Sequence, residues 1–330
     1  MIDVLMPAPL PSLIQEALDG RFRIHRLYAA PDRDAMLKEI GPKVRAIATG
    51  VPILTQDVSA PVTAVLMESL PALEIVANLG VGYDNIDAAW AGANGVIVTN
   101  TPDVLTEETA DTAFGLLLNA VRQFPRAERW LRQGEWLKGQ FEPTASLRDR
   151  TMGVLGLGRI GKAIAKRAEA FGLRVIYHNR KPDPSAPYEY CGSLLDMARR
   201  CDILMIAAPG GPQTKNIVNR EVIEALGPDG ILVNIARGTL VDEVALIEAL
   251  QQRRILTAAL DVFADEPRVP TALMAMEHVV LLPHVGSASQ HTRDAMSRLV
   301  VENLFAWADG NDVLTPVAET PWRRPPKLAV

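Results

Sequence analysis

The chain of 330 residues has only two cysteines, no excess of basic residues and no long apolar run. Cys191 and Cys201 match no metal-binding or redox spacing, and we interpret them as buried or incidental thiols in a reducing compartment. The 34 Lys and Arg against 39 Asp and Glu give a net charge of −5, which provides no electrostatic footprint for a nucleic-acid partner. The same balance provides no attraction to an anionic membrane surface.

Signals for export and for metal binding are also missing. No apolar stretch approaches the roughly 18 residues of a membrane-spanning helix. The first residues, MIDVLMPAPLP, lack the basic start and the apolar run of a secretory signal. We therefore predict a cytoplasmic protein without a membrane partner. We predict no metal site, because no ligand spacing occurs at His25, His178, His278 or His291.

Short apolar runs alternate with helix-like stretches along the whole chain, which is typical of βα units that form a parallel sheet. A first series of predicted strands covers residues 2–6, 24–28, 46–49, 73–79 and 96–99. A second series covers residues 152–155, 175–177, 203–207, 231–235, 258–260 and 279–282. A long helix, with Thr106 as its N-cap and Glu107 and Glu108 in its first turn, separates the two series.

We therefore expect two doubly wound α/β domains. The first comprises residues 1–99 together with 288–330, because a helix from about Ser289 through Trp307 is long enough to return to it. The second comprises residues 100–287. Trp322, in the proline-rich tail, is expected to be a docking anchor.

The clearest local motif is GLGRIG, in which Gly156, Gly158 and Gly161 follow a strand-like run and open an alanine-rich helix. The first glycine permits a tight turn, the second lets the backbone approach a pyrophosphate, and the third allows close packing of helix and strand. The helix N-terminus adds free N–H groups and a positive dipole. This context predicts dinucleotide binding.

Chemically active residues follow several predicted strands. Arg237, Asp261 and His284 each come shortly after a strand of the second series. Ligands bind outside the carboxyl ends of the strands in open α/β sheets. We therefore expect these side chains to gather at one sheet edge beside the glycine motif.

The motifs NLGVGYDNID, GLGRIG, NIARGTLVDEVALIEAL, ALDVFADEP and LPHVGSAS occur in this order. Over nearly its whole length the chain thus resembles the D-isomer-specific 2-hydroxyacid dehydrogenases. The resemblance implies a Rossmann-type nucleotide-binding domain, a flavodoxin-like substrate domain and a homodimer. It assigns catalysis to Arg237, Glu266 and His284, with the last two paired. It also implies that Val81 and Gly82 bind the substrate carboxylate through their N–H groups, and that Asp261 holds the nicotinamide carboxamide.

The predicted catalytic roles follow from side-chain chemistry. Arg237 suits the carbonyl and carboxylate oxygens of a 2-keto acid. His284 suits proton transfer, and Glu266 would orient its ring. The predicted cofactor-binding residues are Gly156, Gly158, Arg159, Ile160, Gly161, Asn179, Arg180, Lys181, Ala208, Pro209, Ile235, Ala236, Asp261, His284 and Gly286. We predict that Tyr83, Trp130 and Trp136 make packing or dimer contacts and take no part in the chemistry. In members of the family that the chain resembles, the segment that contains Trp136 reaches the partner subunit.

The stretch VIYHNRK lies where NAD-specific enzymes carry a carboxylate for the ribose 2′-OH. Here Arg180 and Lys181 could instead pair with a 2′-phosphate. This arrangement resembles the NADPH-preferring glyoxylate and hydroxypyruvate reductases. We therefore predict an NADPH-dependent reductase of small 2-keto acids, with NADH as a weaker cofactor, although a solvated basic turn is the alternative reading.

Other functions remain open at this point. The chain could be an NAD-dependent D-2-hydroxyacid, formate or phosphite dehydrogenase, or a non-catalytic corepressor that senses a dinucleotide. The preferred keto acid is not evident from the sequence. We expect its selection to depend on residues 50–54 and on the dimer segment.

Overall fold

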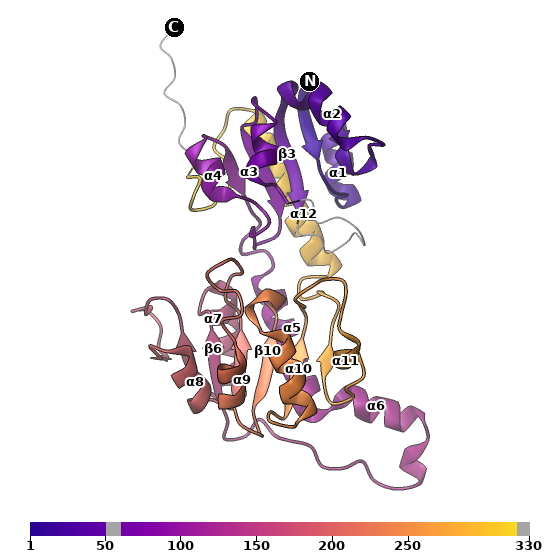
Figure 1. Ribbon diagram of the computed structural model, residues 1–330, viewed down its shortest axis with the longest axis vertical. Coiled ribbons are helices and arrows are strands. Elements are labelled where there is room, and N and C mark those ends of the chain that lie inside the picture. Colours follow the sequence, from indigo (N-terminus) through magenta and orange to yellow (C-terminus); the bar gives the residue numbers. More distant parts are fainter. Residues whose placement is uncertain (51–60, 322–330) are drawn as a thin grey trace. The chain divides into compact units, whose positions relative to one another are not determined.

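The structure is a computed structural model that describes residues 1–50 and 61–321. The chain forms two compact units, one of Met1–Leu105 with Ala288–Val330 and the other of Thr106–Ser287. Each unit is a parallel sheet with helices on both faces (Figure 1). The prediction of two doubly wound α/β domains is therefore confirmed. Residues 51–54 and Trp322, for which the sequence suggested roles, lie outside the described residues.

The first unit is built on a five-stranded sheet. Its strands are β1 (Ile2–Met6), β2 (Phe22–Arg26), β3 (Val44–Gly50), β4 (Ile75–Leu79) and β5 (Ile97–Thr99). Their order is β2-β1-β3-β4-β5, with every pair parallel, which is the flavodoxin-like order. The strands read as apolar runs because both faces of the sheet are covered.

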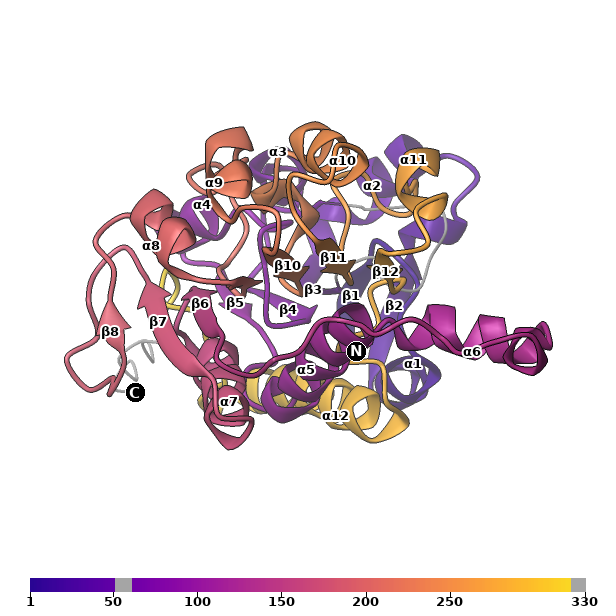
Figure 2. The same ribbon diagram turned by 90° about the horizontal axis from the view of Figure 1, so that it is seen from below.

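Two helical layers cover this sheet. The helices are α1 (Ser12–Asp19), α2 (Arg33–Ile40), α3 (Ala64–Glu68), α4 (Ala88–Ala93) and α12 (Gln290–Ala308). Within this unit, Figure 2 shows α2, α3 and α4 on one face and α1 and α12 on the other. The α12 helix packs on α1 and β4, and its N-cap is Ser289, whose side chain accepts a hydrogen bond from Thr292 N.

The second unit contains a seven-stranded parallel sheet. Its strands are β6 (Thr151–Leu155), β7 (Arg174–His178), β8 (Glu189–Tyr190), β9 (Ile203–Ile206), β10 (Ile231–Asn234), β11 (Thr257–Leu260) and β12 (Val280–Leu281). The order β12-β11-β10-β9-β6-β7-β8 reverses direction between β6 and β9. This is the Rossmann arrangement, in which a ligand binds at the reversal point.

Helices also cover both faces of this second sheet. They are α5 (Thr106–Arg122), α7 (Arg159–Ala170), α8 (Leu194–Arg200), α9 (Arg220–Ala225), α10 (Glu243–Gln251) and the short α11 (Thr271–Met274). The apolar side chains of α5 and α7 pack on one face, and those of α8, α9 and α10 pack on the other. Cys191 and Cys201 are both buried free thiols, as predicted.

Several local predictions need correction, and the strand ends differ from the predicted ranges by up to two residues. The second strand begins at Phe22 rather than residue 24, because parallel pairing sets Phe22 opposite Ile2 and Arg26 opposite Met6, where β1 ends. Beyond Arg26 the chain turns into a 3-10 helix, Leu27–Ala29. Strand β8 was not predicted, because its two residues form no apolar run. Thr106 is the first residue of α5 rather than its N-cap.

Helix α6 (Phe124–Arg132) stands away from the rest of the second unit (Figures 1 and 2). It starts after Gln123, whose left-handed backbone conformation redirects the chain. None of its residues is buried, and the following 3-10 helix (Glu135–Leu137) exposes 67% of Trp136 and 95% of Leu137. We call residues 124–137 the arm.

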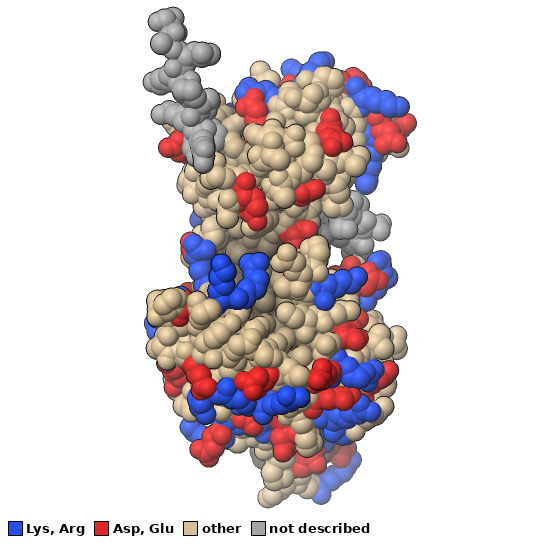
Figure 3. Space-filling view, turned by 60° about the vertical axis from the view of Figure 1, so that its left-hand side comes forward, with Lys and Arg blue, Asp and Glu red and all other residues tan. Residues whose placement is uncertain are grey.

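The described surface carries both signs of charge. In Figure 3, a band of Lys and Arg side chains low on the visible face is intermingled with Asp and Glu. Such a surface agrees with the near balance of 34 basic and 39 acidic residues. None of the described helices combines the length and apolar content needed to cross a membrane.

Candidate active site

The ends of three neighbouring strands carry three of the predicted site residues. Strands β10, β11 and β12 lie side by side and parallel, so their carboxyl ends share one edge. Arg237 follows β10, Asp261 directly follows β11, and His284 follows β12. The edge therefore collects a guanidinium, a carboxylate and an imidazole from separate loops.

His284 and Glu266 form a close pair. Nδ1 of His284 lies 2.7 Å from Oε2 of Glu266, while Oε1 accepts a hydrogen bond from Phe263 N at 2.9 Å. Burial alone would raise the pKa of Glu266, but the hydrogen bond and charge of His284 and the Phe263 N–H outweigh it, so this pKa is lowered. An ionised carboxylate can only accept, so Nδ1 carries a hydrogen and Nε2 is left for other chemistry.

Asp261 holds the loop that carries His284. Only 1% of Asp261 is exposed, and its carboxylate oxygens accept hydrogen bonds from Val285 N at 2.7 Å and Gly286 N at 2.8 Å. Burial raises its pKa, although these two N–H groups act against that shift. A Cβ at Gly286 would lie 2.8 Å from Oδ2, so a side chain there would disturb the contact. Sequence reasoning missed this role of Asp261.

His284 itself has a backbone φ of +54°, in the left-handed region that non-glycine residues rarely adopt. The two hydrogen bonds to Asp261 act on the residues directly after it. These hydrogen bonds hold His284 in the left-handed conformation and offset the free-energy cost of that conformation.

Arg237 is placed by a buried asparagine and a glycine. Asn234, at the end of β10, donates to the carbonyl of Arg237 at 2.9 Å and accepts from Ala236 N at 3.0 Å. A Cβ at Gly238 would lie 1.9 Å from the carbonyl carbon of Phe263, so the loops after β10 and β11 are in direct backbone contact. The charge of Arg237 also helps to lower the pKa of Glu266.

The three motif glycines differ in their surroundings. Gly156 has φ +95°, and a Cβ on it would lie 2.5 Å from Ala208 N; a Cβ on Gly161 would lie 2.2 Å from the Gly156 carbonyl oxygen. These two glycines are needed for the fold. A Cβ on Gly158, by contrast, would meet no described atom within 4 Å, directly before the first turn of α7. The open backbone and helix N-terminus fit a dinucleotide pyrophosphate.

The loop after β7 presents two cations. Arg180 and Lys181 are exposed, and neither has a hydrogen bond or ion pair with another described residue. The oxygen of Asn179 is occupied, since it accepts a hydrogen bond from Leu157 N at 2.7 Å.

One acidic residue near this loop was missed by sequence reasoning. Asp183 lies 2.6 Å from Nζ of Lys162, and this bond together with those from Ser185 lowers its pKa. Its charge is thus engaged locally. Nothing in the spacing of the sequence indicates this pairing.

In the first unit, Val81 and Gly82 follow β4, and neither N–H group has a hydrogen bond to another described residue. The next residue, Tyr83, donates to Glu319 at 3.0 Å. Burial and this carboxylate raise the pKa of Tyr83 to about 12, which makes the phenol a poor proton donor for catalysis. Trp130 packs edge-on against Phe141.

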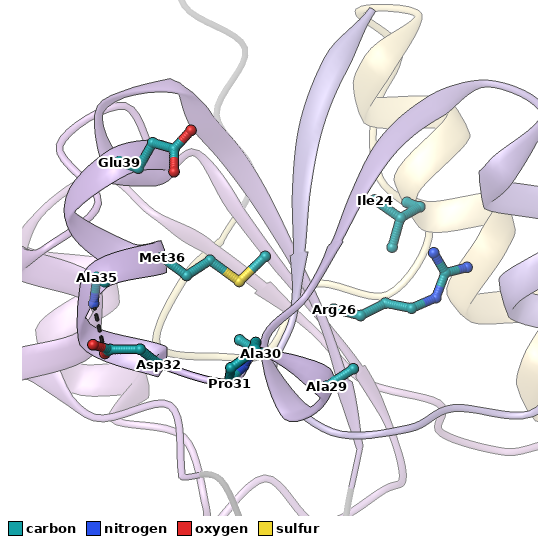
Figure 4. Close-up of a pocket in the computed structure, with 9 residues that line it drawn as sticks. All are labelled: Ile24, Arg26, Ala29, Ala30, Pro31, Asp32, Ala35, Met36 and Glu39. Atoms are coloured by element: carbon teal, nitrogen blue, oxygen red, sulfur yellow. Dashed lines mark hydrogen bonds between the residues drawn. The ribbon is translucent and has the colours of Figure 1, made fainter.

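A shallow pocket elsewhere in the first unit has no catalytic constellation (Figure 4). Its lining consists of Ile24, Arg26, Ala29, Ala30, Pro31, Asp32, Ala35, Met36 and Glu39. Asp32 is used there as the N-cap of α2, accepting from Ala35 N at 2.9 Å. Over residues 1–50 and 61–321, no group of three His, Cys, Asp or Glu side chains could hold a metal ion.

Known proteins are similar to this chain in sequence and in structure. Residues 114–286 match the family model of the D-isomer specific 2-hydroxyacid dehydrogenase NAD-binding domain. Glyoxylate/hydroxypyruvate reductase A of Arabidopsis thaliana is 45% identical over 96% of this chain and 99% of its own. Hydroxyphenylpyruvate reductase of Plectranthus scutellarioides is 43% identical with the same coverage.

Solved structures are similar to this chain as well. The NADPH-dependent glyoxylate/hydroxypyruvate reductase of Sinorhizobium meliloti, solved in complex with NADP and malonate, is 47% identical and superimposes with a TM-score of 0.88. The match covers 98% of this chain and 99% of that one. With a family match over more than half of its residues and relatives above 40% identity along nearly its full length, the chain belongs to the D-isomer specific 2-hydroxyacid dehydrogenases.

Proposed function

We propose that this protein is an NADPH-dependent reductase of small 2-keto acids, which converts glyoxylate to the achiral 2-hydroxy acid glycolate and hydroxypyruvate to a D-2-hydroxy acid. The observation that carries the proposal is the His284–Glu266 pair beside Arg237, at the strand ends of a Rossmann-type sheet. Support for the substrates comes from the names of relatives that are 45% and 47% identical.

The protein's own groups have separate roles in this reaction. Arg237 binds the carbonyl oxygen and one carboxylate oxygen of the substrate and polarises the carbonyl. His284 delivers a proton from Nε2 to the developing alkoxide, because Nδ1 is engaged by Glu266. Glu266 fixes the ring and stabilises its positive charge. The N–H groups of Val81 and Gly82 receive the substrate carboxylate.

The cofactor is held by the glycine motif and the loop after β7. The backbone at Gly158 and the first turn of α7 would hold the pyrophosphate, and Arg180 and Lys181 would hold the 2′-phosphate. Arg159, Ile160, Ala208, Pro209, Ile235, Ala236 and Asp261 complete the proposed contacts. When bound, the reduced nicotinamide supplies the hydride for the substrate carbonyl carbon.

A second candidate substrate is hydroxyphenylpyruvate, which appears in the name of a relative that is 43% identical, against 45% and 47% for the two glyoxylate/hydroxypyruvate reductases. The reaction and the catalytic residues would be the same. Only the space for the substrate side chain would differ.

The proposal includes domain roles and a homodimer. Residues 1–99 with 288–330 act as the substrate domain, and residues 100–287 as the nucleotide-binding domain. The exposed apolar side chains of the arm support a contact with a second copy of the chain. A cytoplasmic location is also proposed, in keeping with two free buried cysteines.

The proposed chemistry is tested by replacing His284. We expect the wild type to oxidise NADPH in the presence of glyoxylate, hydroxypyruvate or 4-hydroxyphenylpyruvate. His284→Gln should lose roughly 10²- to 10⁴-fold in kcat, because the proton donor is gone, with a far smaller change in NADPH affinity. His291→Gln, on the exposed first turn of α12, is the matched control and should behave as wild type.

Either of two results would contradict this proposal. Equal rates for His284→Gln and wild type would remove His284 from the chemistry. Binding of NADPH without turnover of any keto acid by the wild type would favour the dinucleotide-sensing corepressor.

A further inference from the structure

The three residues after β4 have their carbonyl oxygens tied to neighbouring groups. Nδ2 of Asn78 donates to the carbonyl oxygens of Gly80 at 3.3 Å and Gly82 at 3.0 Å. Nδ2 of Asn100 donates to the carbonyl oxygen of Val81 at 2.8 Å. The Gly80 oxygen also accepts from Thr101 N at 2.9 Å. Every carbonyl in this segment therefore has a fixed direction.

Fixing these oxygens also fixes the next N–H groups. A trans peptide is planar, so its C=O and N–H bonds point in opposite directions. Holding the Gly80 oxygen therefore directs the N–H of Val81 away from Asn78 and Thr101. Holding the Val81 oxygen with Asn100 does the same for the N–H of Gly82.

Neither of these two N–H groups, of Val81 and Gly82, has a hydrogen bond to another described residue. Gly80 N, by comparison, donates to the side-chain oxygen of Thr101 at 3.1 Å. Val81 and Gly82 are both partly exposed, and adjacent free N–H groups form a concavity suited to an anion.

Asn78 occupies an unusual position for a polar residue. It lies in the apolar strand β4 and is 1% exposed, so its burial carries a free-energy cost unless its amide is used. An aspartate of the same shape could not replace it, because an ionised carboxylate has no hydrogen to donate to the two carbonyl oxygens.

We propose that Asn78 and Asn100 are positioning residues, which orient the N–H groups of Val81 and Gly82 for the carboxylate of the 2-keto acid. The inference rests on the proposed function, since it concerns how the same enzyme selects substrates that carry a carboxylate. Neither asparagine touches the substrate.

The test compares a substrate that has the carboxylate with one that lacks the charge. Initial rates with saturating NADPH are measured for glyoxylate and for methyl glyoxylate, in the wild type, Asn100→Ala and Asn78→Ala. We expect Asn100→Ala to lower kcat/KM for glyoxylate by about tenfold but that for the ester by no more than about twofold, as expected for the loss of one hydrogen bond. The KM for NADPH should stay unchanged.

Asn94→Ala is the matched control. The amide of Asn94 donates to the Trp90 carbonyl oxygen at 2.8 Å in the same unit, at the exposed end of α4. Loss of this hydrogen bond should leave the ratio of kcat/KM for glyoxylate to kcat/KM for methyl glyoxylate as in the wild type. Asn100 is only partly buried, so Asn100→Ala should fold even if Asn78→Ala is destabilised.

The outcomes separate this inference from the function on which it rests. The wild type could reduce glyoxylate while Asn100→Ala and Asn78→Ala keep the wild-type ratio of kcat/KM for glyoxylate to kcat/KM for the ester. In that case the asparagines have only a structural role and the inference is wrong. If the wild type reduces no keto acid, the proposed function fails and this inference fails with it.

Discussion

At the scale of single residues, the sequence predicts the side chains that we propose to react, but it does not predict the side chains that hold them in place. The resemblance to a known family implies catalysis by Arg237, Glu266 and His284, and the positions of Arg237 and His284 shortly after predicted strands add to that prediction. Asn234 and Asp261 place these residues through hydrogen bonds to backbone groups two to 25 positions away. Sequence spacing does not reveal such bonds, because any nearby polar side chain could make them.

Ionised carboxylates make the stability of the protein depend on pH in a direction that can be worked out. Burial would raise the pKa of Asp3, but the hydrogen bond from His25 at 2.8 Å and the nearby Arg23 outweigh it, so the pKa is lowered. A carboxyl group whose pKa is lowered on folding stabilises the protein at pH values above its ordinary pKa of 3.8. This stabilisation is lost as the pH falls through the folded-state pKa. Glu266 acts in the same direction, and Asp261, whose pKa is raised, acts in the opposite one.

Asp3→Asn tests this dependence. We expect the variant to be less stable than the wild type at pH 7 by about 1 kcal/mol, because an ionic hydrogen bond becomes a neutral one. Urea unfolding followed by circular dichroism should show this difference shrinking as the pH falls below 3.8 and through the lowered folded-state pKa, where the wild-type carboxylate also gains its proton. A difference that stays constant with pH would show that the charge of Asp3 contributes nothing.

At the scale of elements, the turn between β6 and α7 separates glycines required by the fold from the glycine required by the ligand. Gly161→Ala would place a Cβ against the Gly156 carbonyl oxygen and should lower the melting temperature. Gly158→Ala has free space and should melt as the wild type does. It should nevertheless bind NADPH at least about tenfold more weakly, because the new methyl group obstructs the pyrophosphate.

Thermal unfolding and fluorescence titration with NADPH measure these two properties separately. Gly192→Ala is a suitable control, since its Cβ would also meet no described atom within 4 Å and it lies in a different loop. Unchanged NADPH affinity in Gly158→Ala would mean that the motif glycines serve only the turn.

The arm is the element whose exposure a partner best explains. Leu137→Asp and Trp136→Asp place charges on its two most exposed apolar side chains and should convert a homodimer into monomers. Light scattering coupled to gel filtration measures the mass directly. Val65→Asp, at an exposed apolar residue of α3, is the control. A monomeric wild type would contradict the proposed dimer.

At the scale of the whole molecule, the fold class could be predicted from the sequence. Strands of a parallel sheet that is covered on both faces consist of nearly continuous runs of apolar residues, and these runs are visible in the sequence. The two-residue β8 was not predicted, and the ends of the other strands differ from the predicted ranges by up to two residues. The course of the arm was not predictable in this way, since it depends on the left-handed Gln123 and not on any apolar periodicity.

The central claim, an NADPH-dependent reductase of small 2-keto acids, is tested most directly by comparing cofactors in one assay. Rates with glyoxylate and hydroxypyruvate are measured with NADPH and with NADH, in the wild type and in Arg180→Ala. Lys166→Ala, an exposed lysine of α7, serves as the control.

We expect a wild-type kcat/KM at least about tenfold higher with NADPH, and loss of most of that preference in Arg180→Ala, because one charge-assisted contact to the 2′-phosphate is removed. Turnover with NADH alone, or an Arg180→Ala enzyme as selective as the wild type, would contradict the account.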